Sequence, residues 1–283
     1  MLMDGKELAR DIKAKIKAEI DDIKRIYNVN PTVASILVGE DPASQVYLNS
    51  QIKSYQDLGI GVQKYFFSKE ISEAYLLNLI DKLNKDTEVD GIMINLPLPP
   101  QISATKVLNR IKLIKDVDGF KAENLGLLFQ NNEDFISPST PAGIMELIKG
   151  YKIDLEGKDV VVIGRSNIVG KPVAALVLNS HGTVTICNSH TKNLKEKTKT
   201  ADVLISAVGK PKFITADMVK EGAVVIDVGI NRVNGKLEGD VDFENVQKKT
   251  SYITPVPGGV GALTVAMLLS NILKSFKANR GII

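Results

Sequence analysis

Two hydrophobic periodicities alternate along the first half of the chain. Segments with apolar residues at helical spacing are separated by short runs rich in Val, Ile and Phe, which are typical of strands. Strands that alternate with helices predict parallel βαβ units. Helices are expected to about Tyr27, over 43–58, around 73–85 and near 104–111, and strands over 32–39, 61–67 and 91–97.

The pattern changes at residues 129–151, where polar and proline-containing positions lead into a new amphipathic helix started by Thr140 and Pro141. We place a domain boundary there. The chain closes with a long helix, 261–279, whose first part is apolar around much of its circumference, so we expect it to return to the first domain. Between these lie predicted strands over 159–164, 183–188, 201–209, 222–230 and 251–257, and a helix from about Gly170.

Composition narrows the class of protein. A net charge of +3, from 36 basic and 33 acidic residues, argues against a nucleic-acid binder, which would carry a basic stripe. The single cysteine cannot form an internal disulfide, which fits a reducing cytoplasm. The N-terminus alternates charge with aliphatic residues, and no run reaches the roughly 18 apolar residues of a membrane span. We expect a cytoplasmic protein with neither nucleic acid nor membrane as partner.

The stretch "GKDVVVIGRSNIVGKPVAAL" is a candidate nucleotide site. A β-branched run ends at Gly164, and after a polar turn Gly170 opens a helix with Pro172 in its first turn. The N-terminus of a helix suits a pyrophosphate, because its N–H groups are free and its dipole is positive there. The spacing differs from the standard G-x-G-x-x-G fingerprint, so an ordinary strand-to-helix turn is the alternative.

The end of the next strand favours NADP over NAD. An NAD site usually places an acid there to bind the ribose hydroxyl, whereas this chain has "CNSHT". Asn188, Ser189 and Thr191 offer hydrogen bonds, and Arg165 and Lys192 can meet a phosphate.

Three other residues in this region favour structural roles. His181 and His190 have no companion at metal-ligand spacing and are predicted to be turn or surface residues. Cys187 ends a buried strand without a paired base, which indicates packing.

Gly209 and Gly229 follow strands at the carboxyl edge of the sheet, where ligands bind in open α/β sheets.

Eight strings occur in order along nearly the full chain: "EDPASQVY", "GIMINLPLP", "KDVDGF", "STPAGIMELI", "VVVIGRSNIVGKPVA", "VIDVGIN", "GDVDF" and "TPVPGGVGALTVAMLL". Together they resemble the bifunctional methylenetetrahydrofolate dehydrogenase/methenyltetrahydrofolate cyclohydrolase family. The resemblance implies a two-domain α/β fold in which 1–139 with the helix 261–283 binds folate and 140–260 is a Rossmann domain for NADP. It implies a homodimer formed through the Rossmann domains. It also implies oxidation of 5,10-methylenetetrahydrofolate, followed in most members by hydrolysis to 10-formyltetrahydrofolate.

The same resemblance assigns site residues. It implies that Tyr47 lines the folate pocket, that Asp118 bonds the pterin ring, and that Pro257 and Gly261 close over the substrate. For Asp118 alone, an Asx-type turn before Gly119 is the alternative. The cofactor residues that it implies are Gly164, Arg165 and Ser166, with Ser189, Ile230 and Thr264.

The chain departs from the family at two positions that touch chemistry. Gln51 stands where the family has lysine, four residues after Tyr47, and Asn95 stands where it has glutamine. Lys53 lies about 120° around the helix from Tyr47 and should not reach the same pocket. A third departure puts Ala262 and Leu263 in the "GVGPMT" string.

Gln51 affects the two half-reactions differently. Hydride transfer depends mainly on positioning and survives the substitution. Hydrolysis needs a group that exchanges protons, and an amide only donates and accepts hydrogen bonds. We therefore expect dehydrogenase activity with the cyclohydrolase step relaxed or lost, and a catalytic set of Tyr47, Gln51, Asn95 and Asp118.

Two alternatives stay open at this point. One is a Rossmann dehydrogenase of the shikimate or malic type, which the residues around Tyr47 disfavour because such enzymes need a lysine or tyrosine acid/base. The other is a non-catalytic folate or nucleotide sensor, which would bind ligand without turnover.

Overall fold

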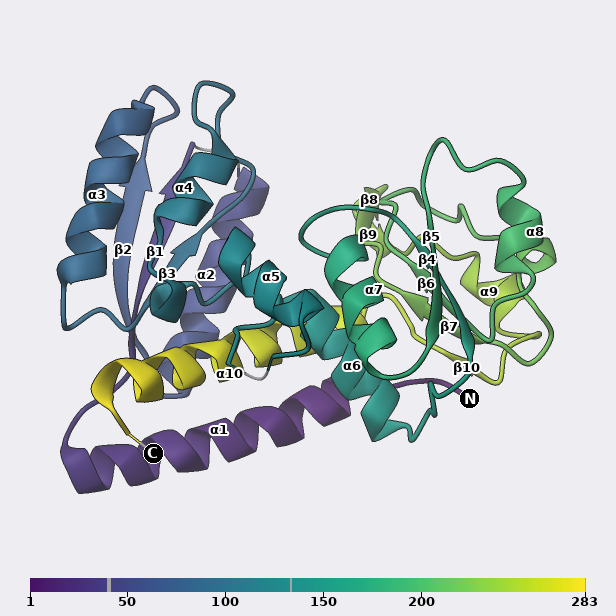
Figure 1. The fold of residues 1–283 in the computed structure, drawn as a ribbon, viewed down its shortest axis with the longest axis horizontal. Helices are drawn as coiled ribbons and strands as arrows, with labels where there is room; N and C mark the ends of the chain where they lie inside the picture. The colour runs from purple at the N-terminus through teal and green to yellow at the C-terminus, as the bar shows by residue number, and fades with distance from the viewer. Residues whose placement is uncertain (40–41, 133, 283) are drawn as a thin grey trace. The chain divides into compact units, whose positions relative to one another are not determined.

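The computed structural model describes residues 1–39, 42–132 and 134–282, without the side chains of 42–47 and 50 (Figure 1). The chain divides into two compact units. Unit 1 comprises Met1–Asp11, Leu128–Glu133 and Pro138–Met267, and unit 2 comprises Ile12–Leu127, Asp134–Ser137 and Leu268–Ile283.

Unit 2 is built on a three-stranded parallel sheet of order β2-β1-β3. Alternate residues of β1, namely Ala34, Ile36 and Val38, pack with α3 and α4 on one face (Figure 1). The other face meets α2, where Tyr55 Oη donates to Met93 Sδ at 3.2 Å. The elements are β1 (Thr32–Val38), α2 (Pro42–Asp57), β2 (Gly61–Phe67), α3 (Glu73–Lys85), β3 (Gly91–Ile94) and α4 (Ala104–Arg110).

Unit 1 holds a five-stranded parallel sheet of order β10-β7-β6-β4-β5. The chain runs from β4 out to the edge strand β5 and then crosses back to β6, so the strand order reverses between β4 and β6. Helices α6 and α7 lie on one side, and α8 and α9 cover the other (Figure 1). The elements are α6 (Ser139–Gly150), β4 (Asp159–Ile163), α7 (Gly170–Asn179), β5 (Thr183–Cys187), α8 (Leu194–Thr198), β6 (Val203–Ser206), β7 (Val224–Asp227), α9 (Phe243–Val246) and β10 (Tyr252–Ile253).

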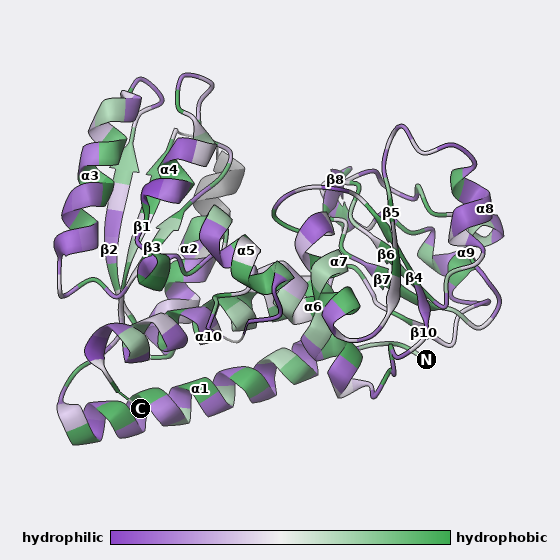
Figure 2. Cartoon of the chain, viewed as in Figure 1, coloured by the Kyte–Doolittle hydropathy of each residue, from purple (hydrophilic) through white to green (hydrophobic). Residues whose placement is uncertain are grey.

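Two long helices, α1 (Gly5–Tyr27) and α10 (Val260–Arg280), contribute residues to both units. Figure 2 shows apolar and polar positions alternating around α1, as the helical spacing predicts. The second part of α10 packs in unit 2, where Asn271 Nδ2 donates to the carbonyls of Val117 and Ser137 at 2.9 Å each. The C-terminal helix therefore returns to the first half of the chain, as expected.

Among the helices described, α10 is the one long and apolar enough to cross a membrane by length and composition. A core helix passes the same test, and 56% of its apolar window is buried inside the protein. Polar side chains such as Asn271 and Ser275 bond backbone carbonyls of unit 2. These contacts are those of a core helix.

The predicted fold class is confirmed, and the differences lie at element ends and in short elements. Helix α6 begins at Ser139, one residue before Thr140. The strand expected over 251–257 extends only over Tyr252–Ile253, since the prolines that follow lack the N–H donors that a strand needs. The elements not expected from the sequence are the short helices α8 and α9, α5 (Ala122–Phe129), the 3-10 turns η1 (Leu113–Lys115) and η2 (Ala216–Met218), and the hairpin of β8 (Asn231–Val233) and β9 (Lys236–Glu238).

Candidate active site

Two glycines shape the point where the strand order of unit 1 reverses. Gly164 follows β4 with a φ of 125°, and a Cβ added to it would lie 2.5 Å from the carbonyl oxygen of Ala207, which follows β6. A Cβ on Gly170 would lie 2.2 Å from the carbonyl oxygen of Gly164. These contacts leave no room for a side chain, so the loop comes close to both neighbours only because both residues are glycine. The crevice at such a point is where open α/β sheets bind ligands.

Ser166 organises the turn between these glycines. Its Oγ accepts from the N–H of Val169 at 3.1 Å and of Gly170 at 3.4 Å, and its carbonyl accepts from Lys171 N at 3.1 Å. The first N–H groups of α7 are therefore engaged, unlike the free groups expected from the sequence. Among the described residues, the N–H groups of Arg165 and Ser166 have no partner, so these earlier loop groups are the ones available to a phosphate.

The turn after β5 presents Ser189 at the surface. Asn188 N donates to Thr191 Oγ1 at 2.8 Å, and His190 N donates to Asn188 Oδ1 at 2.9 Å. Both Ser189 and Arg165 are exposed, which suits groups that meet a phosphate. Cys187 is fully buried in the core of unit 1, confirming its packing role.

Two buried carboxylates, Asp240 and Asp227, bond the backbone of the neighbouring loops, and neither was identified as a site residue from the sequence. Asp240 is fully buried and accepts from the N–H groups of Val208, Gly209 and Lys210 at 2.7, 3.2 and 2.9 Å. Asp227 accepts from Gly229 N and from the N–H of Asp240 itself. Burial, and secondarily the charge of Asp240, raise the pKa of Asp227 to about 6. The signals in the sequence were an acid that ends the apolar run of β7, at Asp227, and an acid that follows the glycine after β9, at Asp240.

The other predicted residues of unit 1 surround a cavity of about 270 Å³ beyond the end of β7. Pro257, Gly261 and Ile230 line it, and the side chain of Ile230 is 65% exposed. Thr264 is half-buried in α10, and its Oγ1 lies 3.0 Å from Oγ1 of Thr140. Thr264 thus already has a partner within the protein.

In unit 2, Gln51 and Lys53 lie on different sides of α2. The side chain of Gln51 is 5% exposed, and its Oε1 has no hydrogen-bond partner among the described residues. Lys53 is exposed, as its position on the helix predicts. Tyr47 belongs to the same helix, but its side chain lies outside the described part of the structure.

Three predicted residues belong to unit 2, namely Gln51 on α2, Asn95 just after β3, and Asp118. Gln51 lies one turn before Tyr55 on α2, and Asn95 directly follows β3, two residues beyond Met93. Because Tyr55 contacts Met93 and α2 runs back along the strands, Gln51 lies toward Asn95. Asn95 Nδ2 donates to the carbonyl of Ile36 at 3.0 Å.

Asp118 is the third member of this group. Asp116 pairs with Ile92 alongside β3, and the N–H of Ile94 bonds the Asp118 carboxyl group. Burial, and then the nearby charge of Asp116, raise the pKa of Asp118 to about 8. Asp116 is itself committed to structure, because it accepts from Lys121 N at 2.8 Å and Asn124 Nδ2 at 2.7 Å. Asp118 thus has fewer hydrogen bonds within the protein than Asp116.

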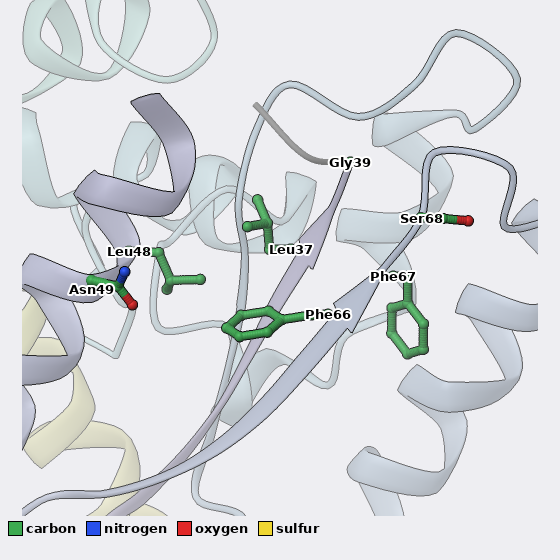
Figure 3. A pocket seen from close by; sticks show the side chains of 7 residues that line it. All are labelled: Leu37, Gly39, Leu48, Asn49, Phe66, Phe67 and Ser68. Atoms are coloured by element: carbon green, nitrogen blue, oxygen red, sulfur yellow. The ribbon is translucent and has the colours of Figure 1, made fainter. Parts of the chain in front are cut away.

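A separate cavity of about 320 Å³ opens between α2 and the first two strands. Figure 3 shows Leu48 of α2 facing Leu37 and Phe66, with Asn49 nearby. None of the predicted site residues whose side chains the structure describes lines it. Within the described ranges, no group of three or more His, Cys, Asp or Glu side chains is placed to hold a metal ion.

Comparison with known families explains this arrangement. Residues 3–118 match the tetrahydrofolate dehydrogenase/cyclohydrolase catalytic domain, and residues 138–280 match the NAD(P)-binding domain of the same family. The chain belongs to the tetrahydrofolate dehydrogenase/cyclohydrolase family. This assignment does not favour the shikimate or malic alternative.

Similar members of the tetrahydrofolate dehydrogenase/cyclohydrolase family cover the whole chain. The bifunctional protein FolD of Fusobacterium nucleatum is 88% identical over 283 residues, the full length of both chains. The crystal structure of the bifunctional enzyme FolD from Campylobacter jejuni superposes with a TM-score of 0.96 at 48% identity, covering 98% of this chain and 99% of that one. The Trypanosoma brucei enzyme, solved with NADP and an inhibitor, gives 0.94 at 34% identity, covering 98% and 97%.

Proposed function

We propose that this protein oxidises 5,10-methylenetetrahydrofolate to 5,10-methenyltetrahydrofolate with NADP. The observation that carries the proposal is the glycine-built turn at Gly164 and Gly170, in a chain that belongs to the folate dehydrogenase family over both domains. A non-catalytic sensor is the weaker candidate, because the Campylobacter jejuni relative, which covers 98% of this chain, is named as a bifunctional enzyme.

The NADP site is assigned to the carboxyl edge of unit 1. Gly164, Arg165 and Ser166 hold the phosphates through the unbonded loop N–H groups, and the exposed Arg165 and Ser189 meet the 2′-phosphate. NADP supplies the acceptor for the hydride. Ile230 covers the cofactor beyond β7. Thr264, whose hydroxyl bonds that of Thr140, is the remaining cofactor residue.

The folate site is assigned to Tyr47, Asp118, Pro257 and Gly261. The carboxylate form of Asp118 accepts hydrogen bonds from the pterin ring, which fixes the orientation of the methylene carbon. Tyr47 lines the ring, and the turn that contains Pro257 and Gly261 closes over the substrate. Residues 1–139 with 261–283 thus form the folate part, and residues 140–260 the NADP part.

We infer that the cyclohydrolase step is lost or severely weakened. Gln51 is buried where the family has lysine, and its amide cannot take up or release a proton near neutral pH. Asn95 is one methylene shorter than the family's glutamine and is held by the carbonyl of Ile36. Hydrolysis needs proton transfer to the leaving nitrogen, whereas hydride transfer does not.

Assaying the two half-reactions separately tests both parts of the proposal. NADP-dependent oxidation of methylenetetrahydrofolate should be robust, and hydrolysis of supplied methenyltetrahydrofolate should stay near the buffer rate. Gln51→Lys, alone and with Asn95→Gln, should raise hydrolysis by about 100-fold or more, the typical contribution of a positioned acid/base. Lys53→Gln, on the exposed side of the same helix, should change neither rate.

Robust hydrolysis by the unmodified enzyme would show that another group replaces the lysine. Turnover of a hydroxy acid in place of folate would refute the dehydrogenase assignment itself.

The protein is further proposed to act as a cytoplasmic homodimer associated through its Rossmann domains. The edge strand β5 supports this proposal, because its burial pattern leaves most of its side chains accessible and its outer backbone groups unpaired. Light scattering on the purified protein should give about twice the mass of 30.8 kDa. A monomer at micromolar concentration would contradict the dimer.

A further inference from the structure

The hairpin of β8 and β9 is separate from the main sheet of unit 1. Its strands are joined by three residue pairs and form a two-stranded sheet of their own. The last pair, Val233 with Lys236, leaves a two-residue loop of Asn234 and Gly235. Both loop residues have a positive φ, of 50° and 79°, as a type I′ turn requires. A two-stranded ribbon with so few pairs is marginally stable on its own, so this turn opens at little cost in free energy.

The amide side chain of Asn234 has nothing to hold it at the tip of the hairpin. Asn234, Gly235 and Lys236 are all exposed. Among the described residues, neither the Asn234 side chain nor the N–H of Gly235 makes a hydrogen bond. A Cβ placed on Gly235 would meet nothing within 4 Å, so the nitrogen of Gly235 is open to solvent and base. The sequence contains no other Asn-Gly pair.

This pairing of groups supports an intramolecular deamidation. After loss of its proton to base, the main-chain nitrogen of Gly235 attacks the side-chain carbonyl carbon of Asn234. The C–N bond of the amide breaks, ammonia leaves, and a five-membered succinimide ring remains. Water then opens the ring at one of its two carbonyls. The product is aspartate at position 234, linked to Gly235 either in the normal way or through the side-chain carbonyl as isoaspartate.

The overall reaction consumes one water and releases one ammonia, and it needs no oxidant, metal or cofactor. Ring closure requires the main chain at Asn234 to rotate out of the turn. The low cost of opening this short hairpin is therefore what allows the reaction in the folded protein.

Two other asparagines that precede a small residue, serine, lack this freedom. Asn179 Nδ2 donates to the carbonyl of Leu128 at 2.8 Å. Asn188 Oδ1 accepts from the N–H of His190 at 2.9 Å. Ring closure at either position would first have to break these bonds, and the serine that follows carries a Cβ that hinders attack. Asn179 and Asn188 are therefore internal references for the rate at Asn234.

The isoaspartyl product is incompatible with the hairpin. It adds one carbon atom to the main chain inside a two-residue loop, whose twist matches the strands only at its normal length. The pairing of Val233 with Lys236 should then be lost. The base of the hairpin is bonded to the buried carboxylate of Asp240, through Asn231 Nδ2 and Asp240 Oδ1 at 3.2 Å. Loosening of the hairpin therefore weakens a bond to the residue that holds the loop after β6.

We propose that Asn234 is a site of spontaneous modification, at which the Asn-Gly pair converts through a succinimide to aspartyl and isoaspartyl forms, and that the isoaspartyl form loosens the β8–β9 hairpin. The proposal goes beyond the proposed enzymatic function and does not depend on it. Its chemistry makes the aged protein a substrate for a methyltransferase that recognises isoaspartyl carboxylates and uses S-adenosylmethionine.

Peptide mapping by mass spectrometry tests the modification on protein aged in mildly alkaline buffer. The peptide with Asn234 should gain the mass difference between an amide and a carboxylic acid. It should do so at least about tenfold faster than the peptides with Asn179 or Asn188, the factor expected when one hydrogen bond must break first. An isoaspartyl methyltransferase with labelled S-adenosylmethionine should label the same peptide of the aged protein.

Two glycine variants provide the matched comparison. Asn234→Gly removes the amide and leaves a Gly-Gly loop, which forms the same two-residue turn, so it should acquire neither the mass gain nor the label. Asn193 is also exposed and has a positive φ of 52°, so glycine is tolerated there. Asn193→Gly should age at Asn234 as the unmodified protein does.

Hydrogen–deuterium exchange tests the effect on the hairpin. In aged protein, exchange over residues 231–238 should be faster than in fresh protein, and exchange in aged Asn234→Gly should match that of the fresh variant. Equal rates of mass gain at the three asparagines would overturn the proposal. So would an unmodified Asn234 in the folded protein after the same segment has reacted in urea, an absence of methyl label, or unchanged exchange in the modified protein. None of these measurements requires turnover, so failure of the proposed enzymatic function would not affect them.

Discussion

The two edges that we propose as ligand sites differ in how they are built. In unit 1 the edge is made of backbone, with glycines that admit no Cβ and with buried carboxylates saturated by N–H groups. In unit 2 the edge is made of side chains, with an amide oxygen at Gln51 that has no described partner and a carboxyl group at Asp118 with a raised pKa. A substitution either leaves the binding by a backbone site nearly unchanged or abolishes it. In a site made of side chains, a substitution can remove one chemical step and leave another.

The largest effect is expected from Gly170→Ala. The new Cβ would lie 2.2 Å from the carbonyl oxygen of Gly164, so the turn must shift. We expect a loss of about 2–4 kcal/mol in the free energy of unfolding and at least a hundredfold loss in kcat/KM for NADP. Thermal denaturation and kinetics measure both. Gly126→Ala in α5, where the added Cβ meets nothing within 4 Å, is the control and should be neutral or slightly stabilising.

A smaller loss is expected from Asp240→Asn. The amide offers one oxygen to the N–H groups of Val208, Gly209 and Lys210, and its own N–H₂ opposes them. The loop after β6 should loosen, costing about 2–3 kcal/mol in unfolding free energy and raising the KM for NADP several-fold. Asp217→Asn, at an exposed carboxylate, should stay within about 0.5 kcal/mol. Equal behaviour of the two variants would contradict a supporting role for Asp240.

The smallest and most selective effect concerns pH and the side-chain edge. With a pKa of about 8, Asp118 is mostly protonated at pH 7, while pterin N–H donors prefer the carboxylate. Affinity for folate should therefore rise with pH, by up to tenfold per unit below the pKa, and level off above about pH 8. In Asp118→Asn it should be weak and independent of pH. Fluorescence titration from pH 6 to 9 measures this slope.

The same shift affects stability in the opposite direction. The pKa of Asp118 is raised in the folded chain, so the unfolded chain ionises first as pH increases. The contribution of this residue to the free energy of unfolding should fall between about pH 4 and pH 8. Urea denaturation should show Asp118→Asn gaining on the unmodified protein across that range. A constant difference would show that Asp118 does not carry the shift.

The sequence predicts the regular elements well because their signals are local. The βαβ alternation, the start of α6 and the solvent exposure of Lys53 follow from hydrophobic period and helix geometry. The hairpin of β8 and β9 was missed although Asn234 and Gly235, both at positive φ, are a strong hairpin signal. The short length of its strands left little hydrophobic alternation to detect.

The site was less predictable where it depends on contacts between distant segments. Asp240 lies about 30 residues in sequence from the loop after β6 to which it is bonded. The string "GDVDF" alone therefore does not predict these bonds. The engagement of the first N–H groups of α7 by Ser166 likewise depends on the path of the turn. Gln51 was identified because the resemblance implies a lysine four residues after Tyr47, and that position can be read directly from the sequence.

The tight contact between Gly164, Gly170 and Ala207 also has a consequence for protein engineering. Because that contact fixes the main-chain path, a redesign of cofactor preference has no useful freedom there. The exposed side chains of Arg165 and Ser189 can be exchanged without disturbing the core. A small library with an acid at position 189 and a neutral residue at 165 would therefore serve to change the cofactor preference of the enzyme from NADP to NAD while the main chain stays the same.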